Sequence, residues 1–125
     1  MKRLVVGADR TQLRLTLFVN AKEYEELLVL EPEERSEEKL IAEFLARHSL
    51  TWQDLHQLGV LVVPHSRTSV RVTLALMQAT GWVLDLPVEL IHSAEITTFS
   101  PRTLWSRLKR RTKKRFSFLT LERMQ

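Results

Sequence analysis

The sequence has no cysteine and only three glycines among its 125 residues. Without cysteine, disulfide bonds and thiolate metal sites are excluded, and a reducing cytoplasm is the expected compartment. The glycines are Gly7, Gly59 and Gly81, so the stretch between Val60 and Thr80 contains none. Loops that bring their backbone close to a phosphate group use glycine to do so. The shortage of glycine therefore argues against a nucleotide-binding loop in the middle of the chain.

Long uninterrupted apolar runs are also missing. The apolar stretch near the N-terminus is too short for the core of a signal peptide, and the apolar segment 70–91 is interrupted by Arg71, Asp85 and Pro87. We therefore expect no membrane-spanning helix. An apolar fraction of 44% and a charged fraction of 27% are ordinary for a soluble globular protein, and the length suits one domain.

The positive charge is unevenly distributed. Residues 1–100 contain 10 Lys and Arg against 14 Asp and Glu, whereas residues 101–125 contain 9 against 1. The net charge of +4 thus combines an acidic part of −4 and a basic part of +8. We predict a folded domain over residues 1–100 and a basic, aromatic C-terminal tail over 101–125, which could be helical.

Hydrophobic periodicity predicts a mixed α/β fold. Alternating or continuous apolar runs indicate strands at 3–8, 13–19, 23–30, 59–63 and 88–91. Ser36 can cap a first helix, and residues 68–84 form a second. The order is β-β-β-α-β-α-β, in which an antiparallel meander precedes two crossovers. This order is typical of a single RNase H-like (actin-like ATPase) half-domain with a mixed sheet.

The helix predicted at 68–84 is apolar on almost every side. One side can lie on the sheet, but a domain of this size has little to cover the other, and an exposed apolar face usually marks a protein interface. Gly81 would allow a partner's backbone to approach, and Trp82 is a typical interface anchor. The interface candidates are Val70, Leu74, Met77, Gly81 and Trp82.

A second arrangement would leave no interface on this helix. The C-terminal segment could fold back over it, and five apolar side chains of that segment are available: Leu104, Trp105, Leu108, Phe116 and Phe118.

The turn and helix after residue 62 resemble a family signature. Val63-Pro64-His65-Ser66-Arg67-Thr68-Ser69-Val70-Arg71-Val72-Thr73-Leu74-Ala75, ending at Leu86-Pro87, is similar to the GPGSFTGxRxGLAxAxGLAxxLxxP pattern of the TsaB (YeaZ) family. Eight positions match: Pro64, Ser66, Thr68, Arg71, Leu74, Ala75, Leu84 and Pro87. Val63, His65, Ser69 and Thr73 stand at glycine positions of the pattern.

Three upstream segments extend the resemblance. Arg35-Ser36-Glu37 with Leu40, Leu50-x-x-x-Asp54-Leu55 and Ala8-Asp9-Arg10-Thr11 are similar to the family's HSE-x-LL, L-x-x-x-D-L and LDTS segments. The matched region is 4–96, which corresponds to the family's N-terminal domain.

The resemblance implies a protein that is not a catalyst on its own. It implies a pseudo-ATPase fold without a cofactor and a partner of the TsaD ATPase in making threonylcarbamoyladenosine in tRNA. It also implies pairing through the two helices of this domain, as a homodimer or as a heterodimer with a TsaD-like or TsaB-like protein.

Two other functions remain open from the residues alone. The basic tail could bind nucleic acid, a tRNA for instance. The residues available for this contact are Arg107, Lys109, Arg110, Arg111, Lys113, Lys114 and Arg115. The tail could instead dock on the acidic domain or, as the least favoured alternative, lie on an anionic membrane. Asp9 could serve an RNase H-like nuclease, but the later strands offer only Glu89, with Asp85 in the turn before it. A role of Asp9 in the turn is therefore favoured. His48, His56, His65 and His92 lack the spacing of a zinc site.

Overall fold

The computed structural model describes residues 1–30, 36–64 and 67–109, except the side chains of residues 67 and 109. The elements in chain order are β1 (Lys2–Ala8), β2 (Gln12–Val19), β3 (Lys22–Val29), α1 (Glu37–Arg47), a 3₁₀ turn η1 (Trp52–Asp54), β4 (Gln57–Val62), α2 (Arg67–Leu84), β5 (Val88–His92) and α3 (Pro101–Lys109). The five strands form one sheet in the order β3-β2-β1-β4-β5. The predicted order up to β5 and the mixed sheet are confirmed.

The sheet is antiparallel at one end and parallel at the other. β1 pairs antiparallel with β2, and β2 pairs antiparallel with β3. β4 pairs parallel with β1 and with β5. The first turn follows from its sequence, because Oδ1 of Asp9 accepts hydrogen bonds from the backbone N–H groups of Thr11 at 2.9 Å and Gln12 at 2.8 Å.

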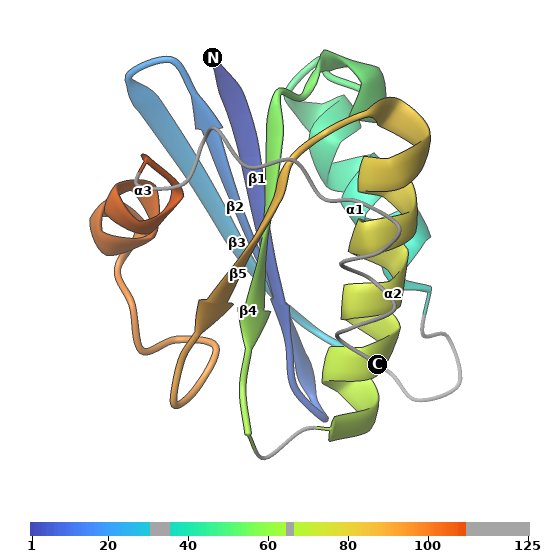
Figure 1. Cartoon of the computed structure of the whole chain (residues 1–125), viewed down its shortest axis with the longest axis vertical. Helices are drawn as coiled ribbons and strands as arrows, with labels where there is room; N and C mark the ends of the chain where they lie inside the picture. The colour runs from blue at the N-terminus through green and yellow to red at the C-terminus, as the bar shows by residue number, and fades with distance from the viewer. Residues whose placement is uncertain (31–35, 65–66, 110–125) are drawn as a thin grey trace.

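α1 and α2 cover the same face of the sheet (Figure 1). Ile41 and Phe44 of α1 and Met77 of α2 join the main hydrophobic cluster with side chains of β1, β2 and β4. Their burial is the principal driving force for this layer. The two helices are also joined by a polar contact inside the protein, since Oγ1 of Thr73 donates to a carboxylate oxygen of Glu37 at 2.6 Å.

α3 lies on the opposite face of the sheet (Figure 1). Its Leu104 and Leu108 are fully buried in a second cluster with Val5 of β1 and Ile91 of β5. Gly59 permits this approach, because a Cβ atom there would lie 3.0 Å from Cδ2 of Leu108. Residues 101–109, which the sequence assigned to the tail, therefore belong to the packed domain in this structure.

The connection from β5 to α3 is held by a buried arginine of β2, a strand in the antiparallel part of the sheet. Arg14 of β2 donates to the backbone carbonyl of Ile96 at 2.7 Å and to Glu25 of β3 at 2.5 Å. The second bond is an ion pair between neighbouring strands.

Among the described residues, no helix combines the length and the apolar character needed to cross a membrane.

Candidate interaction surface on α2

One side of α2 exposes apolar side chains to solvent. Val72 is 49% exposed, Trp82 57% and Val83 77%, and the small side chains of Ala75 and Ala79 between them are also exposed. We call these five residues the α2 face. They recur at spacings of three and four residues, which places them on one side of a helix. The α2 face is a continuous apolar stripe with large residues at its ends and small ones in the middle.

Few polar side chains interrupt this stripe. At about 100° per residue, the same arc of the helix includes only Thr68 and Arg71 as polar residues, both near its N-terminal end and both exposed. Three polar residues of α2 are instead buried: Ser69, Thr73 and Gln78. The usual distribution of polar residues outside and apolar residues inside is thus partly reversed on α2.

The structure places the predicted interface residues on two different sides of α2. Val70, Met77 and Gly81 are buried within the domain, and Leu74 is half-buried against the main cluster. Trp82 is exposed. The stripe chosen from the sequence is therefore not one surface, because four of its five members face the protein's own core.

Gly81 allows a close approach, but within the chain. A Cβ atom at this position would lie 2.5 Å from Cγ2 of Val88 and 3.0 Å from the carbonyl oxygen of Leu86. The missing side chain lets α2 lie against the start of β5. The sequence predicted a close approach at Gly81, but the neighbour is β5 of the same chain and not the backbone of a partner.

The C-terminal segment, which could have folded back over α2 in the alternative arrangement, does not cover it as far as the segment is described. Leu104 and Leu108 are buried on the opposite face of the sheet, and Trp105 packs against that same cluster. Phe116 and Phe118 lie outside the described residues. Within the described part of the chain, the α2 face is therefore left exposed.

The sequence did not identify four residues of the α2 face as interface candidates. They are Val72, Ala75, Ala79 and Val83. A helical projection alone could not separate the two sides, because apolar residues occur on every side of α2. Polar residues usually mark the exposed side of a helix, and in α2 the spacing of Ser69, Thr73 and Gln78 would indicate that side. This indication is wrong here, because all three residues are buried.

Asp9 has the structural role that its place in the first turn suggests. Its Oδ1 holds two backbone N–H groups of the turn, those of Thr11 and Gln12. Asp9 also lines a cavity of about 240 Å³ with Glu95 and Ala94. Within residues 1–30, 36–64 and 67–109, no three His, Cys, Asp or Glu side chains come together as metal ligands would.

Two histidines, His48 and His56, make structural contacts in the described part of the chain. The His48 ring lies 4.3 Å from the ring centroid of Tyr24 and 5.1 Å from that of Phe44. Nδ1 of His56 accepts the backbone N–H of Lys2 at 3.0 Å. His92 is exposed, and His65 lies outside the described residues.

Of the residues predicted to contact nucleic acid, Arg107 is the one whose side chain the structure describes. Arg107 is exposed, and its guanidinium lies 4.9 Å from the ring centroid of Phe99. The side chain of Lys109 lies outside the described residues, as do Arg110, Arg111, Lys113, Lys114 and Arg115.

Solved structures share this arrangement of strands and helices. YeaZ from Pseudomonas aeruginosa superimposes with a TM-score of 0.67 at 13% sequence identity, over 74% of this chain and 45% of that chain. The fold is that of one part of YeaZ. A second structure, described as an uncharacterized protein with similarity to peptidase YEAZ from Pseudomonas aeruginosa, gives 0.64 at 14% identity, over 73% of this chain and 43% of that chain.

The comparisons confirm the RNase H-like half-domain and the resemblance to TsaB (YeaZ) at the level of the fold. T. thermophilus RuvC, solved in complex with a Holliday junction substrate, matches with a TM-score of 0.51 at 16% identity, over 74% of this chain and 64% of that chain. This chain spans less than half the length of the YeaZ structures it matches. A scan against protein-family models and a search of curated proteins found no match.

Proposed function

We propose that this chain is a non-catalytic, TsaB-like interaction protein that docks the α2 face on a partner of similar fold. The observation that carries the proposal is the exposure of Val72, Trp82 and Val83 along one side of a helix. Apolar area of this kind loses contact with water when a partner covers it, and each square ångström buried contributes about 25 cal/mol. Trp82 has the size and amphipathic character of residues that dominate interface energies.

A second copy of the chain is the partner that the pattern of the α2 face fits best. Two α2 helices that cross antiparallel between Ala75 and Ala79 would bring their backbones close, because alanine is small. The Val72 end of one helix would then meet the Val83 end of the other. Arg71 would approach Asp85 of the second copy, and both are exposed charges of opposite sign. Self-complementarity of this type is what a twofold interface requires.

The wider role follows from the shared fold and the resemblance in the first helix and turn regions. A YeaZ-like half-domain with an exposed helix suits an accessory subunit in the formation of threonylcarbamoyladenosine in tRNA. In that role the chain would supply a docking surface and no reacting group. Loss of the gene should then lower this nucleoside in total tRNA, as measured by mass spectrometry of nucleoside digests, and an unchanged amount would remove this role.

The docking surface is tested by placing a charge in the α2 face. Val83→Asp should raise the dissociation constant of the dimer at least about tenfold, because association would bury an unpaired carboxylate. Sedimentation equilibrium over a range of concentrations measures that constant. Val29, an exposed valine on the edge strand β3 with 71% exposure, supplies the matched control, and Val29→Asp should leave the dimer intact.

Two results would count against this proposal. The self-docking form fails if the wild-type chain is monomeric at all concentrations studied. The choice of surface fails if both valine variants dissociate equally or neither does. Met77→Ala provides an internal comparison, since Met77 is fully buried and its truncation should cost about 2–5 kcal/mol of folding stability without a direct effect on docking.

A further inference from the structure

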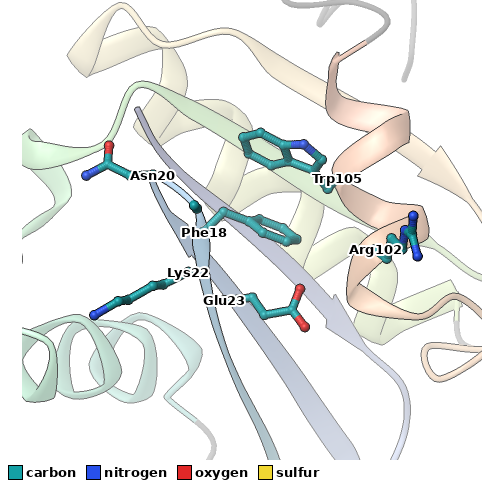
Figure 2. Close-up of a pocket in the computed structure, with 7 residues that line it drawn as sticks. Phe18, Asn20, Lys22, Glu23, Arg102 and Trp105 are labelled. Carbon is teal, nitrogen blue, oxygen red and sulfur yellow. The ribbon is translucent and has the colours of Figure 1, made fainter.

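A cavity of about 440 Å³ lies on the face of the sheet opposite to α2. Figure 2 shows it between the β2–β3 hairpin and α3. Its walls come from Phe18, Asn20, Ala21, Lys22, Glu23, Arg102 and Trp105. The cavity is independent of the α2 face, so a ligand here and a partner there could bind at the same time.

Trp105 provides the main aromatic wall of this cavity. Its ring is only partly buried, and it is held in place from within the protein. Phe18 lies 5.2 Å away between ring centroids at an angle of 46°, and the guanidinium of Arg3 lies 4.4 Å from the ring centroid. An indole held by two neighbours can receive a planar group at little entropic cost.

Most of the charged residues that line this cavity are cationic. Lys22 and Arg102 line the cavity, and Glu23 is the one acidic residue among its lining residues. Arg3 is only 5% exposed, and its Nε and Nη1 atoms are buried without a hydrogen-bond partner in the described part of the chain. Its Nη2 donates to Sδ of Met1 at 2.8 Å, and no carboxylate among the described residues forms an ion pair with it. A buried cation in such surroundings attracts an anion.

We propose that this cavity binds single-stranded nucleic acid, with one base against Trp105 and the neighbouring phosphates close to Lys22 and Arg102. An aromatic wall beside cationic side chains is the combination that binds unpaired nucleotides without base-pair readout. An acidic peptide would neutralise the same cations but would make no use of the ring. In the sequence, α3 leads directly into a run over 110–115 with five basic residues among six, although the proposed site does not include that run.

The test uses the full chain and a fluorescein-labelled twelve-nucleotide oligo-deoxythymidine, followed by fluorescence anisotropy. Arg102→Glu should weaken binding about tenfold and make the salt dependence less steep, because phosphate contacts release counterions. Trp105→Leu should also weaken binding about tenfold while leaving the salt dependence unchanged, because base stacking is not ionic. Glu23→Gln should tighten binding about twofold by removing a repulsive charge.

Arg10 supplies the matched control for Arg102. It is an exposed arginine in the β1–β2 turn, so Arg10→Glu changes the net charge equally without touching the cavity. Equal losses for the two variants would overturn the proposal, as would wild-type affinity of a folded Trp105→Leu variant. Poly-glutamate that competes as well as unlabelled oligonucleotide would overturn it too. If Trp105→Leu does not fold, the affinities of the other two variants decide. Arg102→Glu should bind the oligonucleotide more weakly and Glu23→Gln more tightly than the wild type, and unless both changes are seen the site is rejected.

Discussion

Gly81 of α2 lies directly against Val88 of β5, at a separation that leaves no room for a methyl group. In an isolated helix, Gly81→Ala would be stabilising by about 1 kcal/mol. Here the added Cβ would meet both Cγ2 of Val88 and the carbonyl oxygen of Leu86, and overpacking of this kind costs about 1–3 kcal/mol. We expect a net loss of about 1 kcal/mol in urea unfolding, the balance of the two effects.

Val88→Ala in the Gly81→Ala background tests the cause of that loss. The double variant should recover part of the stability relative to the sum of the single variants, because the side-chain overlap is relieved while the Leu86 carbonyl remains. An alanine at position 81 that raises the stability would show that α2 and β5 are not in close contact.

The sheet was predictable from the sequence because its strands follow simple rules. Leu13–Val19 alternates, and the turns on either side contain Asp9 and Asn20, residues that favour turns. Asn20 adopts a positive φ of 56°, as asparagine tolerates. The parallel strand β4 is buried in five of its six residues, and after Gln57 it is a run without polar side chains.

The orientation of α2 and the packing of α3 on the sheet could not be deduced in the same way. α2 buries the polar Thr73 because Glu37 of α1 is there to accept its hydrogen bond, and this partner is 36 residues away. α3 packs on the sheet through Leu104 and Leu108, one helical turn apart, and through Trp105, among basic and polar residues. In a basic segment, these three residues do not reveal which surface of the domain the helix packs on.

Arg14 should help to fix the position of the loop before α3. Arg14→Met removes the hydrogen bond to the Ile96 carbonyl and the ion pair to Glu25. The buried carbonyl of Ile96 would then lack this hydrogen bond, which should lower the free energy of unfolding by about 1–3 kcal/mol. Urea unfolding measures this loss. We also expect faster amide hydrogen exchange at Leu104, because the loop before α3 loses its attachment.

Arg47 gives the comparison for this prediction. It pairs with Glu26 at the surface, where the arginine is 53% exposed. Arg47→Met should therefore cost less than about 1 kcal/mol and leave the exchange at Leu104 unchanged. Equal effects of the two substitutions would mean that Arg14 does not hold the loop.

Asp9 is expected to act in the first turn and not in catalysis. Asp9→Asn keeps an oxygen that can accept the N–H groups of Thr11 and Gln12, so its stability should be close to that of the wild type. Asp9→Ala loses both bonds and should cost about 1 kcal/mol.

The same pair of variants tests the nuclease alternative. Both should show the same background cleavage of single- and double-stranded DNA and RNA as the wild type in the presence of Mg²⁺ or Mn²⁺. Metal-dependent cleavage that Asp9→Asn abolishes would instead support a nuclease.

Asp54 should make the short turn before β4 sensitive to acid. The backbone N–H of Thr51 donates to its carboxylate at 2.8 Å, and this hydrogen bond is the main reason why the pKa of Asp54 lies below its ordinary value of 3.8. Since the folded-state pKa is lower than the unfolded one, the carboxylate stabilises the fold fully above pH 3.8. That contribution is lost as the pH falls through the folded-state pKa.

An NMR titration of the Asp54 carboxyl carbon measures the shift directly, and a midpoint at or above 3.8 would contradict it. Asp54→Asn should lower the melting temperature at neutral pH, because the charge-assisted bond becomes a neutral one. The difference from the wild type should shrink as the wild-type carboxylate becomes protonated. A difference that stays constant down to the acid limit of folding would mean that the charge of Asp54 contributes nothing to the turn, and that the shape of the side chain alone stabilises it.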